Sequence, residues 1–248
     1  MPTPALSAAA ALDLWERAEP LAPHERALAL ARLAEPTAAA GELARLPLGR
    51  RDALLLRLRA QLAGPALQAT APCPRCGEEL ELSIDVDALL ARQGQWAPPA
   101  PVELDGFVVS WRSPTSEDVA AAAVAGDAAS AERVLLARCV TAANSPAGAM
   151  EPAALPEVVR AAVADAMAAA DPLAEVLLEL GCPACTAAVV VELDLAGFVW
   201  AELGAHTRRL LRDVDVLART YGWSEAEVLA LGEQRRGAYV RLALGGAS

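Results

Sequence analysis

Four of the five cysteines lie in two motifs of nearly the same sequence, Cys73-Pro-Arg-Cys76 and Cys182-Pro-Ala-Cys185. A Cys-x-x-Cys turn at the tip of a hairpin points both thiols to one side of the chain. Two such turns supply the four sulfur ligands of a tetrahedral zinc site that leaves no open position for water. The spacing therefore predicts one structural zinc ion bound by Cys73, Cys76, Cys182 and Cys185.

Strand-like sequence flanks both motifs, and this bears on the alternative interpretations. A thioredoxin-like redox site needs its motif at the N-terminus of a helix in a βαβ unit, so that alternative is disfavoured, as are two local disulfides. The motifs differ at one position, because Gly77 follows the first and eases the turn, whereas Thr186 follows the second. The fifth cysteine, Cys139, lies in a helical segment and is expected in the core.

Side chains for enzyme chemistry are scarce. Of the two histidines, His206 has no acid or nucleophile at a telling spacing, and His24 is expected to be exposed in a first helical turn. The sequence contains no Walker loop, Gly-x-Gly-x-x-Gly, Gly-x-Ser-x-Gly or His-Glu-x-x-His motif. We therefore expect a binding or assembly protein and not an enzyme.

Charge and composition narrow the class of partner. The chain has 248 residues, 55% of them hydrophobic, and a net charge of −11. An acidic chain repels phosphate, so general nucleic-acid binding is not expected. No apolar stretch of membrane-spanning length is free of charges and prolines, so no membrane is expected either. The first twenty residues lack the basic start of a signal peptide, which favours the reducing cytoplasm, where paired cysteines indicate metal more often than disulfide.

Hydrophobic periodicity divides the chain into helical and strand-like segments. In chain order, we expect helices within 8–62, a strand over 80–86, a hairpin turn at Asp105-Gly106, a helical stretch from Thr115 to about Ala143, a loop over 144–156, a helix over 156–170, strands over 176–180 and 189–195, a helix ended by Gly222, a helix capped by Ser224 and Glu227, and a last helix over 234–244.

These segments predict an α+β fold that is mainly helical, with a split zinc-ribbon-like β element carrying a helical insertion. The 105 residues between Cys76 and Cys182 are unusual for a zinc ribbon, but an insertion whose ends lie close in space explains them at little cost in loop closure. The expected regions are an N-terminal helical region over 1–63, the first half of the ribbon over 64–96, a hairpin and helical insertion over 97–173, the second half of the ribbon over 174–196, and a C-terminal helical region over 197–248.

The C-terminal region concentrates residue types that are enriched at binding hot spots. It holds seven arginines against six acids over 197–248, which gives no basic face for reading DNA. Tyr221 and Trp223 are also consistent with filling a small core between the last helices. The candidate partner-binding residues are Arg208, Arg209, Arg212, Trp223, Arg235 and Arg236, with the arginines exposed toward an acidic partner surface.

Several stretches resemble, in content and order, the baseplate hub assembly chaperone family of T-even-type phage tails, whose members also occur in operons for phage-like contractile injection systems. The most specific stretches are the two Cys-Pro-x-Cys hairpins and the turn from Tyr221 to Glu225. All the stretches that carry the resemblance lie within residues 15–35, 46–64, 73–86, 182–203 and 208–242.

The resemblance implies a non-enzymatic role in building a contractile-tail baseplate by binding a hub or wedge protein. It transfers no catalytic residues, only the four cysteines. Two other functions are kept as alternatives, a permanent structural subunit of the baseplate and a zinc-ribbon regulator that binds nucleic acid.

Overall fold

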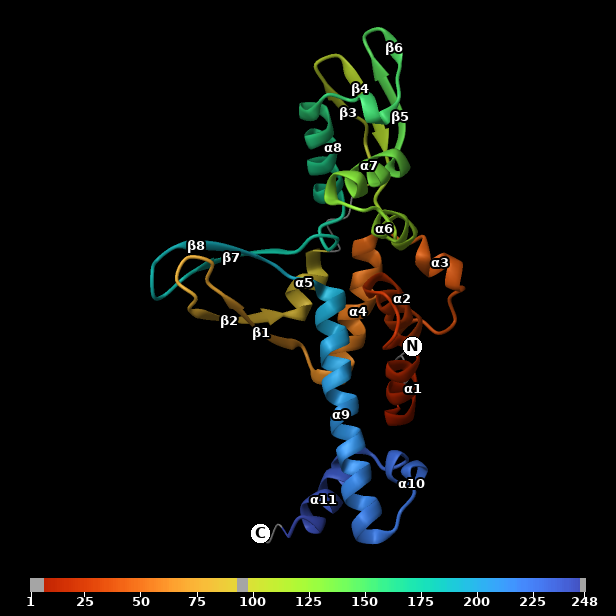
Figure 1. Ribbon diagram of the computed structural model, residues 1–248, viewed down its shortest axis with the longest axis vertical. Helices are drawn as coiled ribbons and strands as arrows, with labels where there is room; N and C mark the ends of the chain where they lie inside the picture. The colour runs from red at the N-terminus through yellow and green to blue at the C-terminus, as the bar shows by residue number, and fades with distance from the viewer. Residues whose placement is uncertain (1–6, 93–97, 246–248) are drawn as a thin grey trace.

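The computed structural model describes residues 7–92 and 98–245, which form an elongated molecule built along one long helix (Figure 1). This helix, α9 (Leu195–Tyr221), has 27 residues. A helical body surrounds its first half, and the last two helices pack on its second half. An arm of two β-hairpins projects sideways from the body, and the insertion stands at the end opposite the C-terminus (Figure 1). The fold is α+β and mainly helical, as predicted.

The helical body buries leucine and alanine side chains between its helices and the start of α9. Leu30, Leu55 and Leu203 are among its fully buried members. Gly64, with a φ of +82°, ends the last helix of this set in a backbone conformation that favours glycine. The helices are α1 (Ala8–Ala18), α2 (Pro23–Ala34), α3 (Ala40–Ala44) and α4 (Leu48–Ala63).

The arm consists of two antiparallel hairpins, one from each half of the predicted ribbon. Their strands are β1 (Ala66–Pro72) with β2 (Glu79–Asp85), and β7 (Leu177–Gly181) with β8 (Ala188–Glu192). The hairpins lie one above the other (Figure 1), and buried side chains of both meet between them, including Leu80 and Val189. The strands predicted over 80–86, 176–180 and 189–195 correspond to β2, β7 and β8, whereas no bounds were predicted for β1.

Two strand ends were predicted too long. Val86 is not the end of a strand but the first residue of helix α5 (Val86–Arg92). Leu195 opens α9, because the carboxylate of Asp194 accepts a hydrogen bond from the backbone N–H of Gly197 and caps that helix. At both places, an apolar residue that continues the alternation of a strand also suits the buried side of a first helical turn.

The insertion has its own sheet and core. Its sheet has the order β3-β4-β5-β6, and α8 packs on it through Val159 and Val163. Asp105 and Gly106 both have positive φ at the predicted turn between the first two strands. The elements are β3 (Val102–Leu104), β4 (Phe107–Trp111), α6 (Ser116–Ala123), α7 (Ala128–Cys139), β5 (Val140–Ser145), β6 (Gly148–Ala149), the 3-10 turn η2 (Pro152–Ala154) and α8 (Glu157–Ala170).

The prediction of one helical stretch from Thr115 to about Ala143 was wrong in two respects. The helix breaks after Ala123, and Asp127 caps a second helix. Val140–Ser145 then forms a strand that pairs with β4, and residues 144–156, predicted as a loop, contain β6 and η2. The alanine-rich sequence favours helix locally, but pairing with the neighbouring strand overrides that preference.

The C-terminal helices agree with the sequence prediction. Gly222 ends α9 with a φ of +73°, and Ser224 and Glu227 form the capping box of α10 (Glu225–Leu229). The last helix, α11 (Glu233–Ala243), packs against α9. We call α10, α11 and the second half of α9 the C-terminal unit. Among the described residues, none of the helices is both long enough and apolar enough to span a membrane.

Candidate metal centre

Each cysteine pair lies in a tight turn that joins the two strands of one arm hairpin. In the first turn, the backbone N–H of Gly77 donates to the carbonyl of Cys73, and the N–H of Cys73 donates to the carbonyl of Glu78. Gly77 has a φ of +78°. This arrangement folds the chain back on itself and leaves the thiols of Cys73 and Cys76 on one side of the turn.

The second turn repeats the first, although its sequence departs at the glycine position. Thr186 donates its N–H to the carbonyl of Cys182, and Cys182 donates to the carbonyl of Ala187. Thr186 adopts a φ of +58°, which is uncommon for a β-branched residue, and its hydroxyl donates to the carbonyl of Cys185. The backbone fold of the turn is thus kept at a local conformational cost.

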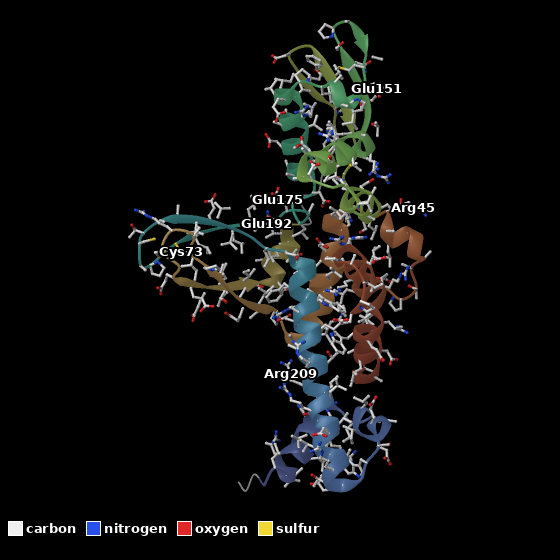
Figure 2. The ribbon with its side chains drawn as sticks, viewed as in Figure 1. Arg45, Cys73, Glu151, Glu175, Glu192 and Arg209 are labelled. Atoms are coloured by element: carbon white, nitrogen blue, oxygen red, sulfur yellow. The ribbon has the colours of Figure 1, made fainter. Side chains whose placement is uncertain are left out.

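The structure brings all four predicted ligands together. The sulfur atoms of Cys73 and Cys185 are 3.8 Å apart, those of Cys76 and Cys182 are 3.6 Å apart, and all four lie within 4.8 Å of one another. Figure 2 shows Cys73 in the outer part of the arm. Because Cys76 meets Cys182, the two ends of the long segment between them also meet at the arm, as the insertion hypothesis requires.

These distances fit a metal better than a disulfide. A disulfide needs a sulfur separation of about 2.05 Å, and all five cysteines are free. Four sulfurs around zinc, at bonds of about 2.3 Å, form a tetrahedron with edges of about 3.8 Å. The four cysteines can therefore hold one metal ion without rearrangement of the backbone. Cys139 lies elsewhere, buried at the end of α7, as expected.

Within the cluster, each thiol influences the pKa of its neighbours, so ionisation of one thiol disfavours ionisation of the next. Backbone N–H groups of Arg75 and Cys76 favour the thiolate of Cys73 and lower its pKa to about 7. The pKa of Cys76 rises to about 12, because the effect of the N–H of Glu78, which favours its thiolate, is outweighed by the neighbouring sulfurs and by burial. Without a cation, these sulfurs cannot all be charged together, whereas a bound divalent metal deprotonates its thiol ligands.

The candidate partner-binding arginines divide into two groups. Arg208, Arg209, Arg212 and Arg235 are exposed, and Arg209 points outward from α9 on the side of the arm (Figure 2). Arg236 does not fit the expectation of exposure: it is 4% exposed, and its Nε donates to the carboxylate of Asp213 at 3.0 Å. Arg236 therefore fastens α11 to α9.

Trp223 is half-buried and stacks on Tyr221 at a centroid distance of 5.0 Å. The ring of Tyr239 meets that of Trp223 edge-to-face at 4.9 Å. The structure thus gives these aromatic residues a packing role within the C-terminal unit, while Tyr221 stays 40% exposed.

A second polar cluster lies at the base of the insertion. Asp118 forms a capping box with Thr115, whose backbone N–H donates to the carboxylate of Asp118. The side chain of Asp118 is fully buried and also binds Arg112 at 2.6 Å and Arg138 at 2.7 Å. Burial acts to raise the pKa of Asp118, but hydrogen bonds from Arg112, Thr115 and Arg138 outweigh it and hold that pKa well below its usual range.

The insertion meets the helical body next to this cluster. The carboxylate of Asp171 accepts a hydrogen bond from the N–H of Gly49 at the start of α4. Arg51 binds Ser116 at 3.1 Å. No spacing rule connects these residues in the sequence, since Gly49 and Asp171 are 122 positions apart.

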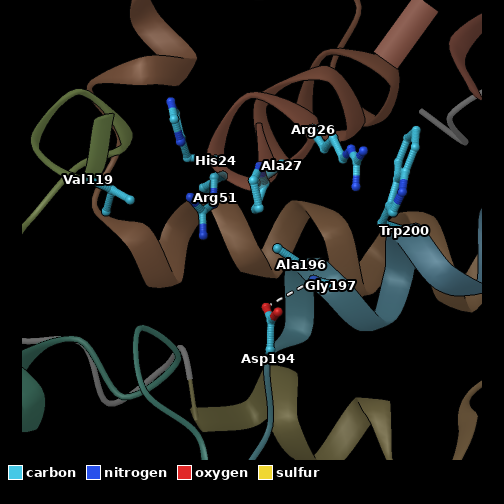
Figure 3. Close-up of a pocket in the computed structure, with 10 residues that line it drawn as sticks. His24, Arg26, Ala27, Arg51, Val119, Asp194, Ala196, Gly197 and Trp200 are labelled. Carbon is cyan, nitrogen blue, oxygen red and sulfur yellow. Dashed lines mark hydrogen bonds between the residues drawn. The ribbon is translucent and has the colours of Figure 1, made fainter. Parts of the chain in front are cut away.

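The cavity between α2, α4 and the start of α9 measures about 310 Å³, and half-buried His24 lies at its edge (Figure 3). Its polar groups already serve the fold: Asp194 caps α9 (the dashed line in Figure 3), and Arg51 binds Asp52 and Ser116. Its lining contains no serine, threonine, cysteine or lysine that could act as a nucleophile. The cavity is therefore a gap between helices in which the carboxylate of Asp194 and the guanidinium of Arg51 are already engaged by the fold.

A family model described as T4 bacteriophage base plate protein matches residues 24–200. The matched part includes both cysteine hairpins, the insertion and most of the helical body. No curated protein and no solved structure matches the chain. Since the family model covers more than half of the 248 residues, the chain belongs to the T4 bacteriophage base plate protein family.

Proposed function

We propose that this chain is a non-enzymatic, zinc-binding assembly protein of a contractile-tail baseplate, in a phage or a phage-like injection system. The observation that carries the proposal is the four-cysteine cluster in a chain of the base plate family. Closed four-thiolate sites hold structure and leave no position for a reacting ligand. The cluster thus supports a protein that presents surfaces to partners.

Zinc is the metal that this donor set favours. Four cysteine sulfurs in a tetrahedral arrangement match zinc, and they do not match the oxygen ligands preferred by magnesium or calcium. Bound by Cys73, Cys76, Cys182 and Cys185, the ion would link two chain segments whose own core is small. The buried members of that core are two of the cysteines with Leu80 and Val189.

Metal analysis of the purified full-length chain tests this part. We expect one zinc per chain and four sulfur ligands by X-ray absorption spectroscopy. A folded sample without zinc that still binds its partner would refute the zinc assignment and leave the family membership untouched.

The arginine-bearing stretch of α9 is the proposed docking face for a hub or wedge protein. Arg208, Arg209 and Arg212 are exposed and form no ion pair with any acid among the described residues. Arg235 is likewise exposed, whereas Trp223 supports this face from within the C-terminal unit. Such a surface complements an acidic partner, because unpaired guanidinium groups bind carboxylates in bidentate geometry.

Co-expression with the baseplate genes of the same operon tests the docking face. We expect the variant with Arg209→Glu and Arg212→Glu to lose co-purification with its partner, which mass spectrometry of the wild-type complex identifies. The matched control carries Arg17→Glu and Arg32→Glu, two exposed arginines of the helical body. Equal capture by both variants would contradict the assignment of this face.

A permanent structural subunit is the second candidate, since the family description names a base plate protein. The two functions differ in whether the chain leaves the particle. Quantitative mass spectrometry of purified mature particles separates them: an assembly factor is absent or far below the copy number of other baseplate proteins, and a structural subunit is present at a fixed ratio.

A further inference from the structure

The outer face of the β7–β8 hairpin is an unpartnered sheet surface with apolar and acidic side chains. Leu177 is 49% and Val190 is 62% exposed on this face. In the strand register, Leu177 lies opposite Glu192 and Val190 lies opposite Glu179, so apolar and acidic side chains alternate across the two strands. Residues 173–194 contain no basic residue, so the face is anionic throughout.

The other layer of the same arm provides an internal comparison. The outer face of β1–β2 carries polar side chains, and Gln68 donates to the hydroxyl of Ser83, its cross-strand neighbour, at 2.9 Å. Glu79 and Glu81 are exposed there, but no exposed large apolar residue accompanies them among the described residues. Water can hydrate the polar side chains of the β1–β2 face, whereas the β7–β8 face leaves two large apolar side chains exposed to water.

Helix α11 carries the complementary surface at the far end of the molecule. It exposes Leu242, at 63%, near its end, and Leu244, at 70%, lies exposed just beyond its last residue. Arg235 lies on the same side of the helix as Leu242, which is seven positions further along. Arg235 and Arg241 are both exposed, and neither forms an ion pair with an acid in the described part of the chain. The opposite side of α11 packs on α9 through buried Arg236. The exposed surface of α11 therefore includes a large apolar side chain, Leu242, and two arginines.

We propose that α11 of one copy packs on the β7–β8 face of a second copy. A two-stranded sheet with one apolar face open to water is completed by a helix that covers that face. Leu242 would lie against Leu177 and Val190, and Arg235 and Arg241 would meet Glu179 and Glu192. Burial of the apolar side chains supplies the attraction, and the opposite charges fix the orientation.

The geometry makes this contact intermolecular. The β7–β8 hairpin is the layer of the arm on the side of the insertion, and α11 lies at the opposite end of the molecule (Figure 1). Helix α9, which separates them, is about 40 Å long by its 27 residues. A contact between two different surfaces of identical chains is head-to-tail, and it generates a ring or an open chain of copies.

This inference does not rest on the proposed function. It uses neither the four cysteines as ligands nor the α9 arginines Arg208, Arg209 and Arg212. Zinc content and partner capture are therefore separate measurements, and self-association can fail while both succeed.

Charge reversal tests the contact in the full-length chain. Light scattering after size exclusion should show a mass above the 25.7 kDa of one chain that rises with concentration. The variant with Glu179→Arg and Glu192→Arg should associate about tenfold or more weakly, because like charges then face each other. The α11 variant, with Arg235→Glu and Arg241→Glu, should be weakened in the same way.

Mixing the two variants provides the decisive result. Each variant repels itself, but the reversed arm of one attracts the reversed helix of the other, so the mixture should associate again. The matched control, with Glu79→Arg and Glu81→Arg on the other layer of the arm, should associate like the wild type. A wild type that stays at the mass of one chain at all concentrations, or a mixture that does not associate, would overturn the proposal.

Discussion

The arm and the insertion both project from the helical body, but they are held in different ways. At the far end of the arm, where the four cysteines gather, the buried side chains are those of Cys73, Leu80, Cys182 and Val189. The near end of the arm joins the core of the helical body through Leu67 and Val176. The insertion has its own apolar core, which includes Val109, Trp111 and Val159. It is fastened at its near end, where Asp118 and Asp171 bind groups around its base.

The difference indicates what each polar cluster does. The far end of the arm buries little apolar surface, so the proposed metal would supply much of the stability there. A sheet covered by a helix already has a core, so its ion cluster mainly fixes where the insertion stands on the body. Loss of the first cluster should therefore unfold a region, whereas loss of the second should loosen a junction.

The largest effect is expected from removing one metal ligand. Cys182→Ser should abolish metal binding and expose both arm hairpins, because structural zinc contributes on the order of 10 kcal/mol to folding in small domains. Hydrogen exchange should rise across residues 66–85 and 177–192 and stay unchanged in the insertion. Cys139→Ser, at a buried cysteine outside the cluster, is the control and should keep the metal. Protection of the arm in metal-free Cys182→Ser would remove the distinction between the two regions.

Neutralising the buried carboxylate of the insertion should have the next largest effect. Asp118→Asn leaves Arg112 and Arg138 without their counter-charge and should destabilise the chain by about 3 kcal/mol in denaturant unfolding. Metal content should not change. The exposed neighbour Glu117 provides the control, and Glu117→Gln should shift the free energy of unfolding by less than about 0.5 kcal/mol.

The pH dependence of the same pair of proteins sharpens this prediction. The folded-state pKa of Asp118 is lowered, so its contribution to stability is fully present above its ordinary pKa of about 4 and is lost as the pH falls further. The difference in unfolding free energy between wild type and Asp118→Asn should be constant near neutral pH and shrink below about pH 4. A difference that grows on acidification would contradict the assigned role of the carboxylate.

A smaller effect is expected where the insertion touches the body. A β-carbon at Gly49 would lie 2.9 Å from the backbone nitrogen of Ala174 and would also collide with the carboxylate of Asp171. Gly49→Ala should therefore cost about 1–3 kcal/mol and raise hydrogen exchange at the junction. Gly126→Ala is the matched control, because no atom lies within 4 Å of the added carbon there. Equal stability of the two variants would show that the junction yields freely.

The smallest effect is expected from exchanging the residue that follows each cysteine pair, which compares the two turns directly. Thr186→Gly should stabilise the second turn by about 1 kcal/mol, because glycine adopts the positive φ without the penalty of a side chain. Gly77→Thr should destabilise the first turn by a similar amount. Competition with a chelator measures both effects as changes in metal affinity, tighter for the first variant and weaker for the second. Opposite signs would mean that the threonine hydroxyl bond to Cys185 outweighs the backbone strain.

Features fixed by neighbours in sequence could be predicted from the sequence. The cysteine pairs form tight turns because the two cysteines of each pair are only three positions apart, so the local backbone conformation determines the geometry of the turn. Gly222 and the Ser224–Glu227 box end one helix and begin the next through hydrogen bonds that span at most a few residues. The alternation of β2 likewise shows which of its faces is buried. These signals were sufficient for the fold class and for the grouping of the four cysteines.

Tertiary structure alone decided the features that depend on partners far along the chain. Strand β5 exists because β4 pairs with it, against the helical preference of its surroundings. Arg236 is buried because Asp213 on α9 lies beside it, and Asp118 becomes a junction because Arg138, 20 positions away, turns toward it. The type of a side chain determines which groups it can bind. Its burial and its partner are determined only when distant segments pack, because packing removes water and each buried polar group must then bond to a nearby protein group.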